Sequence, residues 1–97
     1  MNENEIISKI EQYLMNSQYR EHIKKLGIFG SFARGDISAD SDIDIFVELS
    51  PIKAFDLIGI KQDIEKLTGR HVDIVAIRDK MNPFLKYRIE NEGIIVR

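Results

Sequence analysis

Asp-Ile-Asp-Ile-Phe-Val-Glu-Leu is the sequence of residues 42–49. Apart from its acidic residues the run is branched or aromatic, which is typical of a buried strand. Side chains at positions i and i+2 of a strand project from the same face, about 6.6 Å apart by two strand rises. Asp42 and Asp44 therefore share one face. The opposite face presents Ile43, Ile45 and Val47 to a core.

Helical and strand patterns alternate on both sides of this run. Before it, the sequence predicts an amphipathic helix at 3–18, a short buried strand at 26–29, a short helix after Gly30 and a turn-rich loop at 36–41. After it, we expect a helix at 51–67 with Gly69 as its C-cap, a strand at 72–77, and a helix running from the N-cap Asn82 through Pro83 to about residue 91. The apolar residues 94–96 must then pack somewhere. This order predicts an α/β (α+β) fold with helices covering a small sheet, in a single domain over 1–97.

Composition limits the function classes. The chain has 14 basic and 16 acidic residues among its 97, a net charge of −2, so it lacks the basic surplus of a general nucleic-acid binder. It has no cysteine, which excludes disulfides and thiolate metal sites. No apolar run is long enough to span a membrane, and the acidic first residues do not resemble a signal peptide. We expect a cytoplasmic protein without a membrane partner.

A third aspartate, Asp73, interrupts the apolar strand at 72–77. Aspartate is depleted in strands because its carboxylate is costly to bury. If this strand lies beside 42–49, three carboxylates converge and repel one another unless a cation joins them. A single aspartate at the start of a strand is equally well a cap, but the set of three favours a metal site on Asp42, Asp44 and Asp73. Hard oxygen donors favour Mg²⁺, with Mn²⁺ as a substitute, over Zn²⁺. His22 and His71 lack metal-ligand spacing to each other, and we expect both to be structural.

Residues 30–35, Gly-Ser-Phe-Ala-Arg-Gly, directly follow the first predicted strand. Glycine lets a ligand approach the backbone, and a helix beginning at Ser31 would point free N–H groups at an anion. The Ser31 hydroxyl could bind phosphate or cap the helix, and Arg34 could add positive charge. The alternative is an ordinary turn into a short helix, with Arg34 in solvent. The segment alone does not decide between them.

Gly30-Ser31, Gly35, Ser41-Asp42-Ile43-Asp44 and the distal Asp73 together resemble the DNA polymerase β-like nucleotidyltransferase superfamily, in particular its minimal nucleotidyltransferase branch. The resemblance implies a mixed sheet flanked by helices. It also implies a role for each residue. Gly30 and Ser31 would hold a nucleoside triphosphate, Asp42 and Asp44 would bind two Mg²⁺ ions, and Asp73 would bind the catalytic ion and help deprotonate the acceptor hydroxyl.

Minimal members of this branch are often antitoxins of HEPN-type toxins, and some add AMP from ATP to a toxin tyrosine. The resemblance therefore implies a protein adenylyltransferase with a HEPN-type partner. Two alternatives stay open: a nucleotidyltransferase that modifies a small molecule, and a binding module that neutralises a toxin by contact alone. The apolar tail suggests association with a partner or with a second copy.

The last predicted helix carries aromatic and basic residues whose roles the sequence does not fix. We expect Phe84 and Tyr87 to belong to the core rather than to stack on a base. The basic set is expected on a solvated face, with contact to nucleotide or partner as the alternative: Arg78, Lys80, Lys86 and Arg88.

Overall fold

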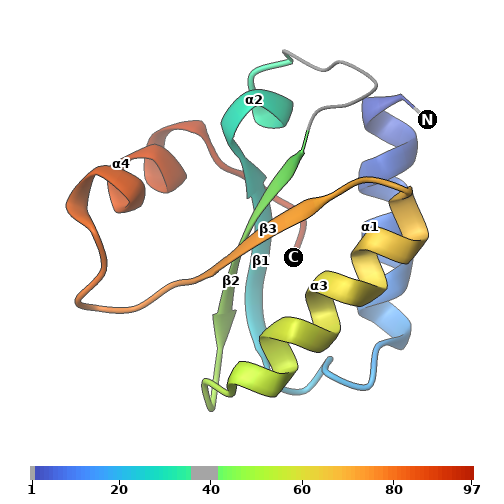
Figure 1. The fold of residues 1–97 in the computed structure, drawn as a ribbon, viewed down its shortest axis with the longest axis horizontal. Coiled ribbons are helices and arrows are strands. Elements are labelled where there is room, and N and C mark those ends of the chain that lie inside the picture. Colours follow the sequence, from blue (N-terminus) through green and yellow to red (C-terminus); the bar gives the residue numbers. More distant parts are fainter. Residues whose placement is uncertain (1, 36–41) are drawn as a thin grey trace.

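The computed structural model of the protein describes residues 2–35 and 42–97. The predicted loop at 36–41, which includes Ser41, lies outside the described residues. Along the chain (Figure 1), the elements are α1 (Glu3–Asn16), β1 (Ile23–Phe29), α2 (Gly30–Ala33), β2 (Ile43–Leu49), α3 (Ala54–Thr68), β3 (Val72–Ala76), α4 (Pro83–Glu92) and β4 (Ile94–Ile95).

The strands form a mixed sheet, as the resemblance implied. Their order is β3-β2-β1-β4. β1 runs antiparallel to both β2 and β4, whereas β2 and β3 are parallel. β4 was not predicted as a strand. Its two residues are too few to show a periodic pattern, but Ile95 pairs with Gly27 and gives the apolar tail its place at the sheet edge.

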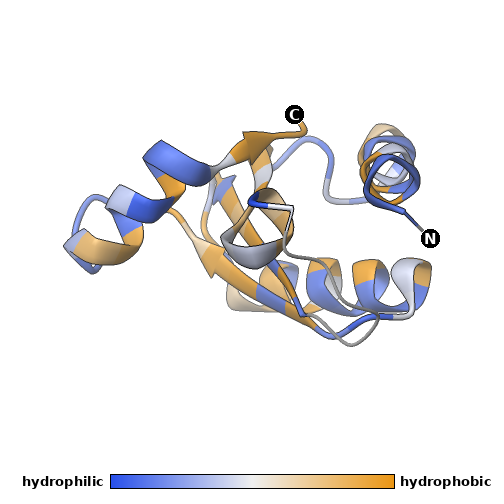
Figure 2. Cartoon of the chain, turned by 90° about the horizontal axis from the view of Figure 1, so that it is seen from above, coloured by the Kyte–Doolittle hydropathy of each residue, from blue (hydrophilic) through white to orange (hydrophobic). Residues whose placement is uncertain are grey.

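Helices cover both faces of the sheet. In Figure 1, α1 and α3 lie on one side of the strands and α4 on the other, an arrangement that Figure 2 shows from above. The larger core lies under α1 and α3 and includes Ile43, Ile45 and Val47, as expected from the alternation in β2. A smaller cluster on the opposite face joins Phe29, Phe46 and Ile89 of α4. Asp44 of β2 and Asp42, which precedes it, therefore share a face with α4.

The ends of the helices mostly follow their capping residues. Asn82 accepts hydrogen bonds from the N–H groups of Phe84 and Leu85, with Pro83 at the first helical position, as predicted. Gly69 ends α3 in the left-handed conformation, at φ 69°. α3 begins at Ala54 rather than at residue 51, and β1 begins at Ile23 rather than at residue 26. The residues before α3 are turn formers, and β1 begins with lysines after Ile23. Neither stretch has the regular spacing of apolar residues from which a boundary is predicted.

The prediction that Phe84 and Tyr87 belong to the core is wrong. Their exposed fractions are 83% and 66%. α4 contacts the sheet through Ile89, its one buried residue. At 100° per residue, Tyr87 lies about 200° and Phe84 about 140° around the helix from Ile89, so both face away from the sheet.

None of the helices in the described ranges, 2–35 and 42–97, combines the length and the apolar character that a bilayer-crossing segment needs.

Candidate active site

The parallel pairing of β2 with β3 brings the acidic residues of the two strands together. Asp44 is the register partner of Asp73, and Ile43 is the partner of Val72. The N–H of Ile43 also donates to the carbonyl oxygen of His71 at 2.9 Å. The parallel register therefore extends by one residue beyond the start of each strand. Asp42 therefore stands beside His71. Residues two apart share a strand face, so these positions form two successive rows on the face that α4 also covers.

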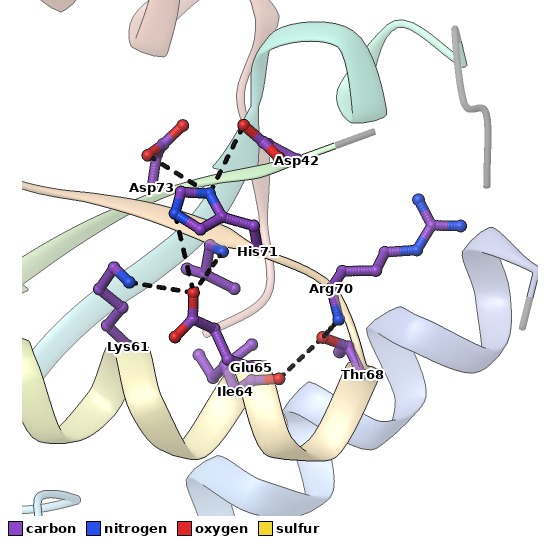
Figure 3. A network of polar contacts seen from close by, with 9 residues as sticks. Asp42, Lys61, Ile64, Glu65, Thr68, Arg70, His71 and Asp73 are labelled. Atoms are coloured by element: carbon purple, nitrogen blue, oxygen red, sulfur yellow. Dashed lines mark hydrogen bonds and ion pairs between the residues drawn. The ribbon is translucent and has the colours of Figure 1, made fainter. Parts of the chain in front are cut away.

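The first row and Asp73 make a compact group of ligand atoms, which Figure 3 shows from close by. His71 Nδ1 lies 3.5 Å from Asp42 Oδ2 and 3.8 Å from Asp73 Oδ1. One ligand atom from each of the three residues lies within 4.8 Å of the others. All three residues are exposed, so an ion or a substrate can reach them from solvent.

The sequence did not predict that His71 lies in this group, and its structural role stays a prediction. Its imidazole points at the aspartates rather than into the fold. The missed signal was the i, i+2 spacing. His71-Val72-Asp73 repeats the polar–apolar–polar pattern of Asp42-Ile43-Asp44, and two such strands in parallel register must place all four polar side chains on one face. The other histidine, His22, precedes β1 at the end away from this group.

A third carboxylate, that of Glu65, lies on the other side of the His71 ring. His71 Nε2 lies 4.0 Å from Glu65 Oε2. That oxygen accepts hydrogen bonds from the N–H of Val72 at 3.0 Å and from Lys61 Nζ at 2.9 Å. These contacts, the Val72 bond first, lower the pKa of Glu65, so the carboxylate stays ionised beneath the ring.

Asp44 lies against the start of α2. Phe29, the last residue of β1, is its register partner, and Gly30 follows with φ +74°. A Cβ atom at Gly30 would collide with Asp44 Oδ2. Glycine is therefore required twice here, for the left-handed backbone and for the space that the carboxylate occupies. This contact places the Gly-Ser segment directly beside the aspartates.

The charge of Asp44 is poorly compensated by the protein itself. Partial burial raises its pKa first, and the negative charges of Asp73 and Asp42 raise it further. Arg88 and Arg34 oppose this rise. A carboxylate in this setting gains from a bound cation, which would remove the repulsion with Asp73. The donor chemistry of Asp42, Asp44 and Asp73 thus fits a hard divalent ion such as Mg²⁺.

Arginines from two elements lie at the border of the site. Arg34 Nη1 donates to Glu92 Oε2 at 3.1 Å and so joins the end of α2 to α4. Arg88 is exposed, as expected, but its guanidinium lies over the ring of Phe29, 5.6 Å from the centroid. Both cations are close enough to influence Asp44.

The two residues expected to hold triphosphate occupy the first turn of α2. This helix begins at Gly30 with Phe29 as its N-cap, so Ser31 is its second residue and not its cap. Ser31 is half-buried. The first N–H groups of a helix have no partner within the helix, and here they are next to Asp44.

Comparison with known proteins identifies the family. The profile described as "Polymerase beta, Nucleotidyltransferase" matches residues 8–97. A Methanocaldococcus jannaschii protein named as a "putative protein adenylyltransferase" is 39% identical to the chain over 97 residues, which is 99% of each sequence. The chain belongs to the polymerase beta nucleotidyltransferase family.

Solved structures of nucleotidyltransferases share this fold. One described as a "putative minimal nucleotidyltransferase" superposes with a TM-score of 0.77 at 28% identity, covering 97% of this chain and 95% of that one. The antitoxin–toxin complex described as a tri-AMPylated Shewanella oneidensis HEPN toxin with its MNT antitoxin gives a TM-score of 0.70 at 20% identity, covering 98% of this chain and 71% of that one. The first of these agrees with the minimal nucleotidyltransferase branch that the chain resembles, and the second has the same fold.

Proposed function

We propose that this nucleotidyltransferase moves AMP from ATP to a hydroxyl group of a partner protein, and that it acts as the antitoxin of a HEPN-type toxin whose tyrosine is the acceptor. The observation that carries the proposal is the meeting of Asp42, Asp44 and Asp73 beside the Gly30 turn. A nucleotide bound at that turn would have its phosphates next to the carboxylates.

Asp42, Asp44 and Asp73 would hold two Mg²⁺ ions, with Mn²⁺ as a substitute. Bound there, the ions would supply Lewis-acid stabilisation of the attacking and leaving oxygens. Without a cation the same carboxylates would repel a triphosphate, so we expect nucleotide binding itself to depend on the metal.

The backbone of Gly30 and Ser31 would bind the phosphates through the free N–H groups of the first turn, and Ser31 would add its hydroxyl. Arg34 would contribute positive charge from the end of the same turn. Since its guanidinium already donates to Glu92, it would act at the rim of the site and help to fix α4 against it.

Asp73 would take the proton of the acceptor hydroxyl. The freed oxygen forms a bond to the α-phosphorus while the bond from that phosphorus to the bridging oxygen breaks and pyrophosphate leaves. Asp73 suits this role because it stands on the edge strand β3 and is exposed, so a large acceptor can approach it. Its partner Asp44 is shielded between β1 and β3.

The choice of a protein acceptor rests on what the similar proteins are described as doing. The Methanocaldococcus relative is named as a protein adenylyltransferase, and the Shewanella complex holds an AMPylated toxin. There are two alternatives. The chain would transfer the nucleotide to a small molecule, or it would be an antitoxin that acts by binding alone. The proposed role requires ATP, so the proposal keeps the cytoplasmic location expected from the sequence. Any self-association would have to leave β3 open, because the acceptor approaches Asp73 there.

The test is transfer of label to a HEPN-type toxin offered as the partner protein. Purified partner is incubated with ATP labelled at the α-phosphate and, in parallel, at the γ-phosphate. We expect the unaltered chain to transfer label only from the α-phosphate and only with Mg²⁺. Asp42→Asn/Asp44→Asn should abolish transfer, whereas the exposed Asp79→Asn should not, because Asp79 follows β3 at its other end.

Two results would contradict the proposal. Label retained in excess EDTA would remove the metal requirement. Neutralisation of the toxin by the double variant, without label, would make the chain a binding module.

A further inference from the structure

The carboxylates assigned to Mg²⁺ do not account for the group around His71. Magnesium is held by oxygen donors, and the three aspartates supply them without help. Yet the ligand atoms that cluster most closely are those of Asp42, His71 and Asp73, and Asp44 is absent from that group. A nitrogen donor facing two carboxylates changes which metal the site prefers.

We propose that Asp42, His71 and Asp73 form a binding site for a first-row transition metal ion, which takes Zn²⁺ in preference to Mg²⁺. The site shares two aspartates with the Mg²⁺ ions of the proposed function but does not depend on that function being correct. Imidazole with carboxylate is a donor set that suits Zn²⁺.

The spacing of the donor atoms supports this assignment. Zinc bonds to nitrogen and to carboxylate oxygen are about 2.0–2.2 Å long, so donors on a tetrahedral ion are about 3.4 Å apart. His71 Nδ1 lies 3.5 Å from Asp42 Oδ2 and 3.8 Å from Asp73 Oδ1. Small side-chain rotations would bring these atoms to the ligating distances. Since the three side chains come from neighbouring strand ends, the backbone that carries them is already in place.

A carboxylate faces the second ring nitrogen of His71. Metal-binding histidines commonly present their second nitrogen to a carboxylate or a carbonyl, which sets the tautomer. Here Nε2 faces Glu65 Oε2 at 4.0 Å, a separation that one water can bridge. Glu65 is itself held by Val72 and Lys61. A proton on Nε2 leaves the lone pair of Nδ1 directed at the two aspartates.

The competing explanation is a simple surface ion pair between a protonated imidazole and the aspartates. If His71 only forms an ion pair, replacing it should not lower the affinity for Zn²⁺ more than that for Mg²⁺. The two explanations therefore predict different metal affinities. The chain contains two histidines, and His22 provides a matched control. His22 also pairs with an aspartate, Asp56 at 3.0 Å, but it precedes β1 at the end away from the site.

The experiment is calorimetric titration of Zn²⁺ and, separately, of Mg²⁺ into metal-free protein without nucleotide. The unaltered chain, His71→Gln and His22→Gln are compared. We expect Zn²⁺ to bind at least about tenfold more tightly than Mg²⁺, and His71→Gln to weaken Zn²⁺ by on the order of tenfold or more. Its Mg²⁺ affinity should change by less than about twofold, because imidazole is not a favoured Mg²⁺ ligand. His22→Gln should change neither.

Unchanged Zn²⁺ affinity in His71→Gln would overturn the proposal, and so would an equal loss of Mg²⁺ affinity. The variant should fold, since the His71 side chain is exposed and only its carbonyl oxygen bonds to Ile43. X-ray absorption of the zinc-loaded protein gives a second measurement. An imidazole nitrogen in the first shell is expected, and a shell of oxygen alone would contradict the site. Neither measurement uses transfer of AMP, so failure here leaves the proposed function standing, and the reverse also holds.

Discussion

At the scale of single residues, Gly30 and Asp44 depend on each other. The carboxylate of Asp44 fills the space that a side chain at position 30 would need. The same backbone position has φ +74°, a conformation that L-residues adopt at a cost of about 1–2 kcal/mol. The glycine is therefore part of the carboxylate site as well as of the turn, and the effects of changing it can be separated.

Gly30→Ala should lower the free energy of unfolding and also displace Asp44. Gly35→Ala is the matched control, because Gly35 has a similar φ of +82° but no atom within 4 Å of the added Cβ. We expect both variants to lose about 1–2 kcal/mol of stability from backbone strain, measured by urea unfolding. Only Gly30→Ala should lose Mg²⁺-dependent ATP binding as well. Equal binding by the two variants would contradict the placement of Asp44 against the turn.

Asp44→Asn should make the metal-free protein more stable. The pKa of Asp44 is raised in the folded state, chiefly by burial and then by Asp73, so the folded chain holds this proton more tightly than the unfolded chain. Stability must then fall as the pH rises from the ordinary carboxyl range through the folded pKa. In EDTA, the melting temperature of Asp44→Asn should exceed that of the unaltered chain at pH 7, and the difference should vanish at about pH 3, below the ordinary carboxyl pKa. A lower melting temperature at pH 7 would show that the protein already compensates this charge.

At the scale of elements, α4 is held to the sheet by few contacts but carries one wall of the site. Its buried residue Ile89 packs with Phe29 and Phe46, and the partly buried Leu85 adds to the same cluster. Polar contacts supply further ties. Arg88 lies over Phe29, and Glu92 accepts from Arg34 at the end of α2. The position of both arginines therefore depends on one small apolar cluster.

Ile89→Ala should cost about 2–4 kcal/mol, because it removes most of a buried side chain and leaves a cavity. Phe84→Ala removes a larger side chain from the same helix but should cost less than about 0.5 kcal/mol, since Phe84 is 83% exposed. Thermal unfolding of the two variants measures the difference. Comparable losses would show that Phe84 is packed and that α4 docks in another rotation.

The sequence predicted helices and strands well where a periodic pattern was long. It predicted them poorly where a single residue or a single tertiary contact determines the structure. The β2 alternation and the caps at Gly69 and Asn82 were sufficient for their elements. β4 was not predicted because it is defined by its tertiary pairing with β1, which its own two residues do not reveal. His71 escaped because its position depends on the parallel register of two strands, although the i, i+2 spacing was visible in the sequence.

At the scale of the whole molecule, the site is a product of the topology. Residues 30, 42–44 and 71–73 are distant along the chain, and the order β3-β2-β1 brings them to one end of the sheet. The turn after β1 supplies the glycine, and the starts of the two parallel strands supply the acidic residues. If the proposed function holds, this arrangement makes nucleotide binding and metal binding one event rather than two.

Calorimetric titration of ATP, with Mg²⁺ and with EDTA, tests that claim most directly. The unaltered chain, Asp42→Asn/Asp44→Asn and the control Asp79→Asn are compared, and no knowledge of the acceptor is needed. We expect ATP to bind the unaltered chain and the control only when Mg²⁺ is present, and the double variant not to bind it at all. ATP binding that is equally strong in EDTA, or that survives in the double variant, would contradict a site in which the aspartates hold the metal that holds the nucleotide.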